Sequence, residues 1–234
     1  MNLRIEVVAI DCLMVRLFDA IDEANMPWML AATLRLREGF AAQLIDLVPS
    51  YTTLMVHYDL LALSPTQARA IITDALKDLT PDAAQGGRQH VLPVWYDLSV
   101  GPELSLLSRR SGLSVEEVIS RHSQREYQVF ALGFAPGFGF MGLVEEILAA
   151  PRIKTPRKRV VAGSVGIAER QTAAYPLESP GGWNILGRTP AKLFDREIDG
   201  YSLMQPGDTV RFAAVDHAEF MRLGGDDTPL EGLA

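Results

Sequence analysis

Residues 175–190, "YPLESPGGWNILGRTP", place turn-forming residues on both sides of an apolar centre. A linker would not carry Trp183, Ile185 and Leu186, and a regular strand would not contain Pro180-Gly181-Gly182. Glycine has no Cβ atom, so another group can approach its main chain closely. The stretch therefore predicts tightly turned β structure, with something packed or bound against Gly181 and Gly182.

The surrounding residues 133–190 hold nine of the 19 glycines and six of the 14 prolines. Two short helices are predicted ahead of them, over 101–112 and 113–123, the second with a Ser114–Glu117 capping box. Many short strands joined by tight turns are typical of a closed or sandwiched β domain. We expect this domain over 96–234, with a frayed tail from residue 222 and with strands at 127–134, 159–167, 172–177, 183–188 and 204–215.

Residues 1–95 show a different pattern. Helices are expected after Asn25 and Ser64, each an N-cap with a proline in the first turn. Strands are predicted at 12–18, 41–48, 51–58 and 89–96. The order strand–helix–strand–strand–helix–strand predicts a ferredoxin-like split βαβ domain, so the whole chain is expected to be an α+β protein of two domains.

Composition excludes several classes of protein. The 234 residues are 48% hydrophobic and 22% charged, with a net charge of −7, which argues against a nucleic-acid-binding protein. No apolar run reaches the roughly 18 residues of a membrane span, and the N-terminus does not resemble a signal peptide. We therefore expect a cytoplasmic protein without membrane contact. Cys12 is the only cysteine, which excludes an internal disulfide and predicts a small core residue.

Two stretches favour a ligand site. "GFAPGFGFMG", residues 133–142, alternates glycines with aromatic residues, which suits a pocket where backbone N–H groups meet a small polar ligand. The alternative is a β-corner whose phenylalanines plug the barrel. Between Glu146 and Glu169 there is no acidic residue, but there are five basic ones: Arg152, Lys154, Arg157, Lys158 and Arg159. This basic segment is either an anion site or a solvated loop.

Individual residues within these stretches leave alternatives open. Arg152 and Arg157 are five apart on an extended chain, so they face opposite sides, and we favour Arg157 as the inward clamp for a carboxylate or phosphate. Arg152 is then a surface ion pair or a ligand contact. Gln171 offers an amide to a ligand or stabilises a loop, and His122 is catalytic or stabilises a helix C-terminus. No P-loop, serine-hydrolase elbow or metal-ligand spacing occurs in the sequence.

Taken together, four motifs in order resemble one family: "EVISRHS", "GFAPGFGFMG", "PRIKTPRKRVVAGSVGIAERQTAAYPLESPGGWNILGRTP" and "QPGDTVRF". The family is that of the 5-oxoprolinase B subunit, also described as allophanate hydrolase subunit 1 or as sporulation-kinase inhibitors. The resemblance implies an N-terminal α/β domain and a cyclophilin-like β-barrel. Isomerase activity would rest on that fold analogy alone.

The resemblance implies one component of an ATP-dependent 5-oxoprolinase, a hydrolase that opens 5-oxo-L-proline to L-glutamate and whose C and A subunits would be the partners. ATP would bring Mg²⁺, and no metal bound by the protein itself is expected. We predict catalytic roles for His122, Arg157 and Gln171. We predict substrate or ATP contacts for Pro136, Gly137, Phe138, Arg152, Ser164, Tyr175, Gly181, Gly182 and Trp183. The chain alone is expected to show no turnover.

Two other functions remain open on the resemblance. One is a regulator that inhibits a sensor histidine kinase, and the other is a component of an allophanate- or urea-processing carboxyltransferase or hydrolase. The sequence departs from the family pattern at pocket edges, which leaves the substrate undecided; the departures are Gly139, Val161, Glu169 and Ala173-Ala174.

Overall fold

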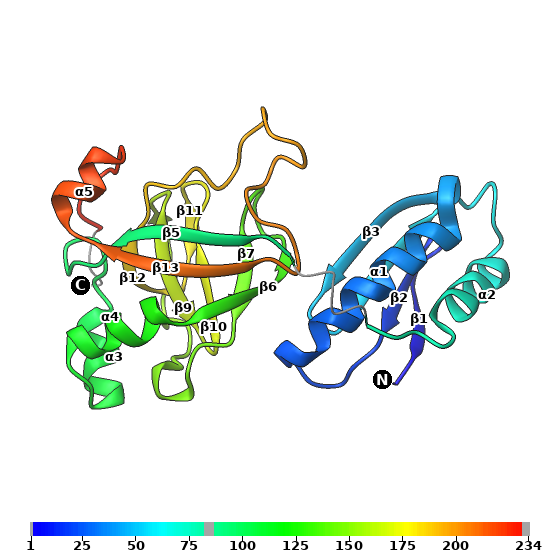
Figure 1. The fold of residues 1–234 in the computed structure, drawn as a ribbon, viewed down its shortest axis with the longest axis horizontal. Helices are drawn as coiled ribbons and strands as arrows, with labels where there is room; N and C mark the ends of the chain where they lie inside the picture. Colours follow the sequence, from blue (N-terminus) through cyan, green and yellow to red (C-terminus); the bar gives the residue numbers. More distant parts are fainter. Residues whose placement is uncertain (1, 82–86, 231–234) are drawn as a thin grey trace. The chain divides into compact units, whose positions relative to one another are not determined.

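The computed structural model describes residues 2–81 and 87–230, which fall into two compact units, Met1–Gly86 and Gly87–Ala234 (Figure 1). The sequence analysis placed the boundary after residue 95. The difference is one strand, because β5 (Gln89–Trp95) belongs to the second unit. None of the helices among the described residues combines the length and apolarity that a bilayer crossing requires.

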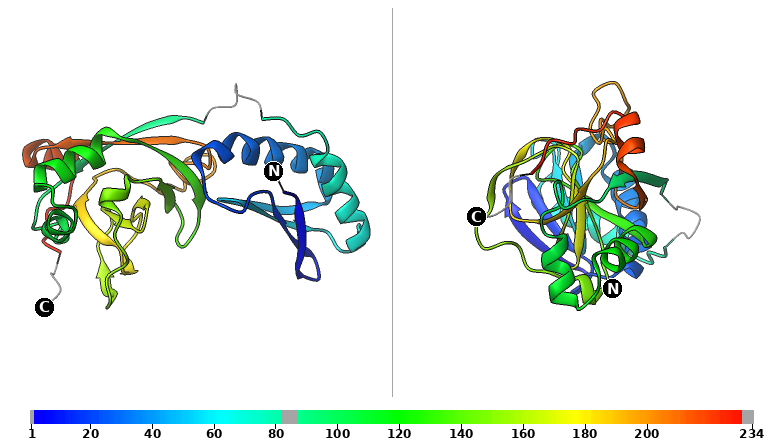
Figure 2. Two further views of the ribbon diagram at one scale, coloured as in Figure 1. Left: turned by 90° about the horizontal axis from the view of Figure 1, so that it is seen from below. Right: turned by 90° about the vertical axis from the view of Figure 1, so that its left-hand side faces the viewer.

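The first unit is a four-stranded antiparallel sheet with two helices. Along the chain it contains β1 (Arg4–Ala9), β2 (Cys12–Arg16), η1 (Glu23–Asn25), α1 (Met26–Phe40), η2 (Ala41–Gln43), β3 (Leu44–Ser50), β4 (Thr53–Tyr58) and α2 (Pro65–Leu76). The strand order is β1-β2-β4-β3. The helices α1 and α2 lie together on one face of the sheet (Figure 2).

Local sequence explains these elements. The strands alternate, so Leu13 and Val15 of β2 are buried while Cys12 and Met14 are half-buried on the other face. The helix α2 begins with the predicted capping box, in which Ser64 accepts from the Gln67 N–H and Gln67 accepts from the Ser64 N–H. The predicted cap on α1 is not made, because the Asn25 side chain donates to the Ala20 carbonyl instead.

The predicted ferredoxin-like domain is not confirmed. The expected fourth strand, β5, pairs in parallel with β13 (Thr209–Val215) in the second unit. The edge position beside β2 is taken by β1, a strand that the sequence analysis did not predict. Alternation identifies β5 as a strand, but it does not determine which sheet provides its hydrogen-bonding partner.

The second unit is a closed seven-stranded barrel, with strand order β10-β7-β6-β13-β5-β12-β9 and β9 paired to β10. A separate ribbon pairs β8 with β11. The remaining elements are α3 (Leu104–Ser111), α4 (Val115–Gln124), β6 (Glu126–Leu132), β7 (Gly139–Gly142), η3 (Glu146–Leu148), β8 (Arg157–Val160), β9 (Ser164–Ala168), β10 (Gln171–Ala174), β11 (Ser179–Gly181), β12 (Asn184–Arg188) and α5 (His217–Arg222).

The barrel agrees with the predicted closed β domain, and the two helices before it are also confirmed. Ser114 and Glu117 form the expected capping box on α4, and Gly112 ends α3 with a positive φ of 73°. Buried apolar side chains from the strands fill the barrel and include Leu92, Val129, Ile167, Leu186 and Phe212. The barrel therefore has a packed core.

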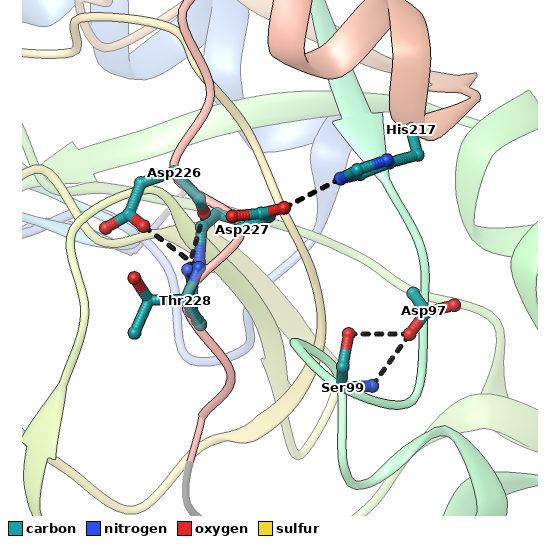
Figure 3. A network of polar contacts seen from close by, with 7 residues as sticks. Asp97, Ser99, His217, Asp226, Asp227 and Thr228 are labelled. Carbon is teal, nitrogen blue, oxygen red and sulfur yellow. Dashed lines mark hydrogen bonds and ion pairs between the residues drawn. The ribbon is translucent and has the colours of Figure 1, made fainter.

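The expected frayed tail is wrong for residues 226–230. The buried Arg188 guanidinium donates to the main-chain carbonyls of Asp226 and Thr228, at 2.6 and 2.7 Å, and Leu230 N–H donates to the Ser99 carbonyl. Figure 3 shows the polar side chains beside this segment, where the Asp227 carboxylate lies 2.9 Å from Nε2 of His217. These contacts hold the tail on the barrel; residues 231–234 lie outside the described part of the chain.

Candidate functional site

A cavity of about 220 Å³ lies between the β8–β11 ribbon and the loop before β7. Segments far apart in the sequence supply its walls, because the barrel brings the loop at 133–138 next to Tyr175 and the turn at 180–183. Its lining residues are Phe134, Phe138, Phe140, Arg152, Pro156, Tyr175, Pro180, Gly181, Gly182 and Trp183.

Aromatic rings form most of the cavity wall. Phe138 is central, with ring centroids 5.3 Å from Tyr175 and 5.7 Å from Trp183, both edge to face. Phe134 is exposed over 65% of its surface and also contacts Phe138. Phe138 is buried in an aromatic cluster beside the barrel core and also lines the cavity, and a polar ligand bound by backbone N–H groups of residues 133–142 stays a prediction.

Tyr175 is the polar group of this wall. Burial raises its pKa to about 12, while the positive charge of Arg152 and a backbone hydrogen bond with Trp183 oppose the rise. The hydroxyl therefore stays protonated at neutral pH and can donate a hydrogen bond to a carbonyl or carboxylate oxygen.

Tyr175 also explains Gly181. A Cβ atom at position 181 would lie 2.3 Å from the Tyr175 hydroxyl oxygen, so any side chain there would force the Tyr175 ring to move. At Gly182 the nearest atom would be 3.6 Å away, an ordinary contact with Pro156. Gly181 thus accommodates a side chain of the same chain rather than a ligand, and the tyrosine it admits lines the cavity.

We expect Gly181→Ala to lower the free energy of unfolding of the barrel unit by about 1–3 kcal/mol, because the new methyl group overpacks a filled site. Gly182→Ala is the matched control and should change it by less than about 0.5 kcal/mol. Urea unfolding followed by tryptophan fluorescence measures both. In a Tyr175→Phe background the cost of Gly181→Ala should shrink, since the closest atom is the hydroxyl oxygen. Equal costs at both glycines would contradict this explanation.

A second, larger hollow of about 640 Å³ adjoins the first at Arg152, which lines both. Arg110 of α3 and Lys154 give it two further exposed cations. Among the described residues that line the two hollows, none is Asp, Glu or His. The remaining lining residues are Leu106, Ala150, Pro151, Ile153, Thr155 and Asn184. The pair therefore combines an aromatic cavity with a cationic cleft.

Arg157 does not line either hollow. Its guanidinium is buried and lies 2.5 Å from Oε1 of Glu103, whose other oxygen accepts the Ile185 N–H at 2.8 Å. Both side chains are almost fully buried, with exposures of 5% and 6%. The inward position was predicted correctly, but the carboxylate that Arg157 clamps is Glu103 of the same unit.

His122 lies in the barrel core rather than at the cavity. Its Nε2 is 2.8 Å from Oγ1 of Thr172, which donates its own proton to the Gly166 carbonyl. Nε2 therefore carries the proton, and Nδ1 accepts from the Tyr96 hydroxyl at 2.8 Å. Burial lowers the pKa of His122 to about 3. This imidazole is neutral and fully bonded, which indicates a structural role.

The other predicted site residues also fall into two groups, those that line the cavity and those that do not. Phe138, Arg152, Tyr175, Gly181, Gly182 and Trp183 line the cavity. Gln171 begins β10, paired with Gly142 and Ala168, and is half-buried outside the cavity lining. Ser164 is fully buried in β9. Gly137 has a φ of 82° and packs on Leu193, and Pro136 beside it is exposed.

Arg110 is a site residue that the sequence analysis missed. It lies four residues after Leu106 on α3, so both project from the same face of the helix toward the cleft. That spacing is visible in the sequence. What the sequence does not reveal is that this face of α3 lies beside residues 150–155.

Comparisons with known proteins agree with this architecture. Residues 3–204 match the family described as "Carboxyltransferase domain, subdomain C and D". The chain is 34% identical over 227 residues to the 5-oxoprolinase B subunit of Bacillus subtilis (strain 168), covering 93% of this chain and 95% of that protein.

Two solved structures are also similar. The crystal structure of TTHA0988 shows 36% identity and a TM-score of 0.76 over 88% of this chain, which spans 40% of that longer chain. The urea amidolyase of K. lactis has a TM-score of 0.76 over 97% of this chain and 16% of its own length, at 14% identity, so it shares the fold. With a closed barrel, a family match over most of its length and a full-length relative, the chain belongs to the carboxyltransferase subdomain C and D family, the family of the 5-oxoprolinase B subunit.

Proposed function

We propose that this chain is one component of an ATP-dependent 5-oxoprolinase, which opens the lactam ring of 5-oxo-L-proline to give L-glutamate. One observation carries the proposal: an aromatic cavity and a cationic cleft adjoin and share Arg152. The cavity of about 220 Å³ suits a small ring compound with a polar edge. The cleft suits the phosphates of a nucleotide.

The reaction would need both the cavity for the lactam and the cleft for the nucleotide. An unstrained lactam resists water, so its oxygen first takes the γ-phosphoryl group from ATP and ADP leaves. Water then adds to the ring carbon and the C–N bond breaks, leaving an amine and an acyl phosphate. A second water releases phosphate and glutamate. Cations near the phosphates stabilise the first step, and hydrogen-bond donors near the lactam oxygen orient it.

Arg152 would serve both reactants, because it lines both hollows. Arg110 and Lys154 would hold the phosphates together with the Mg²⁺ that the nucleotide brings. The Tyr175 hydroxyl would donate to the lactam or its carboxylate. Each of these roles is positioning or electrostatic stabilisation.

A base is missing from this set. Activating water needs a group that accepts a proton, and the described lining of the two hollows offers no carboxylate or imidazole. The base would therefore come from another polypeptide, which we propose to be the C or the A component of the 5-oxoprolinase. This agrees with the name of the Bacillus subtilis relative, which designates one subunit among several.

The test is glutamate release from 5-oxoproline and ATP by this chain combined with the C and A subunits. We expect Arg152→Ala to lower kcat/KM at least 100-fold, about 2.7 kcal/mol of transition-state stabilisation. Arg159→Ala is the matched control, because Arg159 comes from the same basic segment but is exposed, pairs with Glu178 and lines neither hollow.

Glutamate production by this chain alone would contradict the shared site. Equal activity of Arg152→Ala and Arg159→Ala in the complex would remove the roles assigned to the two hollows.

A further inference from the structure

Three metal-ligand side chains meet on the open face of the sheet in the first unit. Cys12 at the start of β2 and His57 of β4 are direct cross-strand partners. Asp11 precedes Cys12 in the turn between β1 and β2, and its Oδ2 lies 3.0 Å from Nε2 of His57. One ligand atom of each residue lies within 4.8 Å of the other two.

We propose that Asp11, Cys12 and His57 bind a divalent transition metal of the Zn²⁺ class. A thiolate, an imidazole and a carboxylate are the ligand types that zinc prefers, with bonds of about 2.0–2.3 Å. Such bonds place tetrahedral ligand atoms roughly 3.3–3.8 Å apart. Strand pairing fixes the backbone at Cys12 and His57, so any adjustment toward that spacing would come from rotation of the side chains.

The charge of the site also favours a dication. A thiolate and a carboxylate would neutralise Zn²⁺ and leave the imidazole neutral. Asp46 of β3, the register partner of His57, adds a further negative charge nearby.

A metal can reach the site without unfolding. The side chains of His57 and Asp11 are 31% and 35% exposed. Three protein ligands leave one tetrahedral position for water or for an atom of a bound partner. The site therefore differs from a closed structural zinc site, and it is independent of the cavity in the second unit.

No metal site was predicted from the sequence, because ligands that converge through strand pairing show no recognisable metal-ligand spacing along the chain. Here the ligands come from residues 11–12 and 57, and pairing of β2 with β4 brings them together. The chain also contains two Asp–His pairs without a thiol, His90–Asp208 and His217–Asp227. These two pairs serve as internal controls, because they show whether an Asp–His pair without a thiol binds the metal.

The test uses the full chain, purified without metal and titrated with Co²⁺ and Zn²⁺. We expect one Co²⁺ per chain, with a near-ultraviolet charge-transfer band from the Cys12 thiolate and tetrahedral visible bands. Zn²⁺ should displace it. Asp11→Asn and His57→Gln keep the thiol and should each weaken binding at least about tenfold, and Cys12→Ser should remove the charge-transfer band.

The control is His217→Gln, which removes a more exposed Asp–His pair that has no cysteine in its metal-ligand set, and it should leave Co²⁺ binding unchanged. Circular dichroism of each metal-free variant checks that it is folded. Absence of stoichiometric binding, or binding unaffected by Asp11→Asn and His57→Gln, would overturn the proposal. Neither result bears on glutamate release by the assembled complex, so the two proposals fail separately.

Discussion

Arg157→Ala is expected to lower the free energy of unfolding of the barrel unit by about 3–5 kcal/mol, the usual cost of leaving one member of a buried ion pair without its partner. The Glu103 carboxylate is 6% exposed, so bulk solvent would stabilise its charge poorly once the guanidinium is removed. Glu103 also holds the Ile185 N–H, and it is the N-cap residue of α3. The pair therefore connects the β8–β11 ribbon to α3 and β12.

Urea unfolding measures this effect, because Trp95 and Trp183 report on the barrel unit. Arg159→Ala is the matched control: its pair with Glu178 is exposed at 68% and 52%, and its loss should cost less than about 1 kcal/mol. The double variant Arg157→Ala/Glu103→Ala should be less destabilised than Arg157→Ala alone, since no charge is then left buried. An unchanged unfolding midpoint for Arg157→Ala, together with loss of activity in the complex, would restore the predicted ligand clamp.

The second large effect is acid destabilisation through His122. Its pKa is about 3 in the folded chain, where burial disfavours the charged imidazole, and near 6.5 when unfolded. Between these values the unfolded chain binds a proton that the folded chain does not. Stability from this group is therefore complete above about pH 6.5 and is lost as pH falls toward 3, by about 1.4 kcal/mol per pH unit. At pH 4.5 the expected loss is about 2.7 kcal/mol.

Unfolding free energies of the parent chain and of His122→Gln, measured from pH 4 to 7, isolate this contribution from that of the carboxyl groups. We expect the difference in slope to correspond to one proton. Nitrogen chemical shifts of the imidazole should show the neutral form with its proton on Nε2 throughout that range. A titration midpoint near 6.5 would show that the imidazole is accessible to solvent and would reopen a catalytic role.

Six of the predicted contact residues line one cavity, and close packing explains the identities of two of them, Gly181 and Phe138. Gly181 is glycine since the Tyr175 hydroxyl occupies the space of a side chain, and Phe138 is aromatic since it packs against Tyr175 and Trp183. Dense glycine and aromatic patterns thus mark the neighbourhood of a cavity. Their functional role stays a prediction until the complex is assayed.

Arg157 and His122 were both misplaced because their side-chain partners are distant in the sequence. Arg157 was assigned to a ligand because Glu103, 54 residues away, gives no local sign of pairing with it. His122 was expected either to be catalytic or, when charged, to stabilise a helix C-terminus, and its burial as a neutral imidazole against Phe212, Tyr96 and Thr172 supports neither role. Burial of a polar side chain depends on what packs over it, and adjacent residues do not specify that.

Elements that are determined by residues close together in the sequence could be predicted from the order of the amino acids alone. Capping residues begin α2 and α4, a glycine ends α3, alternation marks the strands, and glycine–proline turns enforce a compact β unit. Other features emerged only when the chain was seen folded: β5 completes the barrel, β1 forms the edge of the first sheet, and residues 226–230 dock on Arg188. The reason is that backbone N–H and C=O groups are identical along every strand edge, so the choice of partner depends on which apolar faces are buried together once the whole chain has folded.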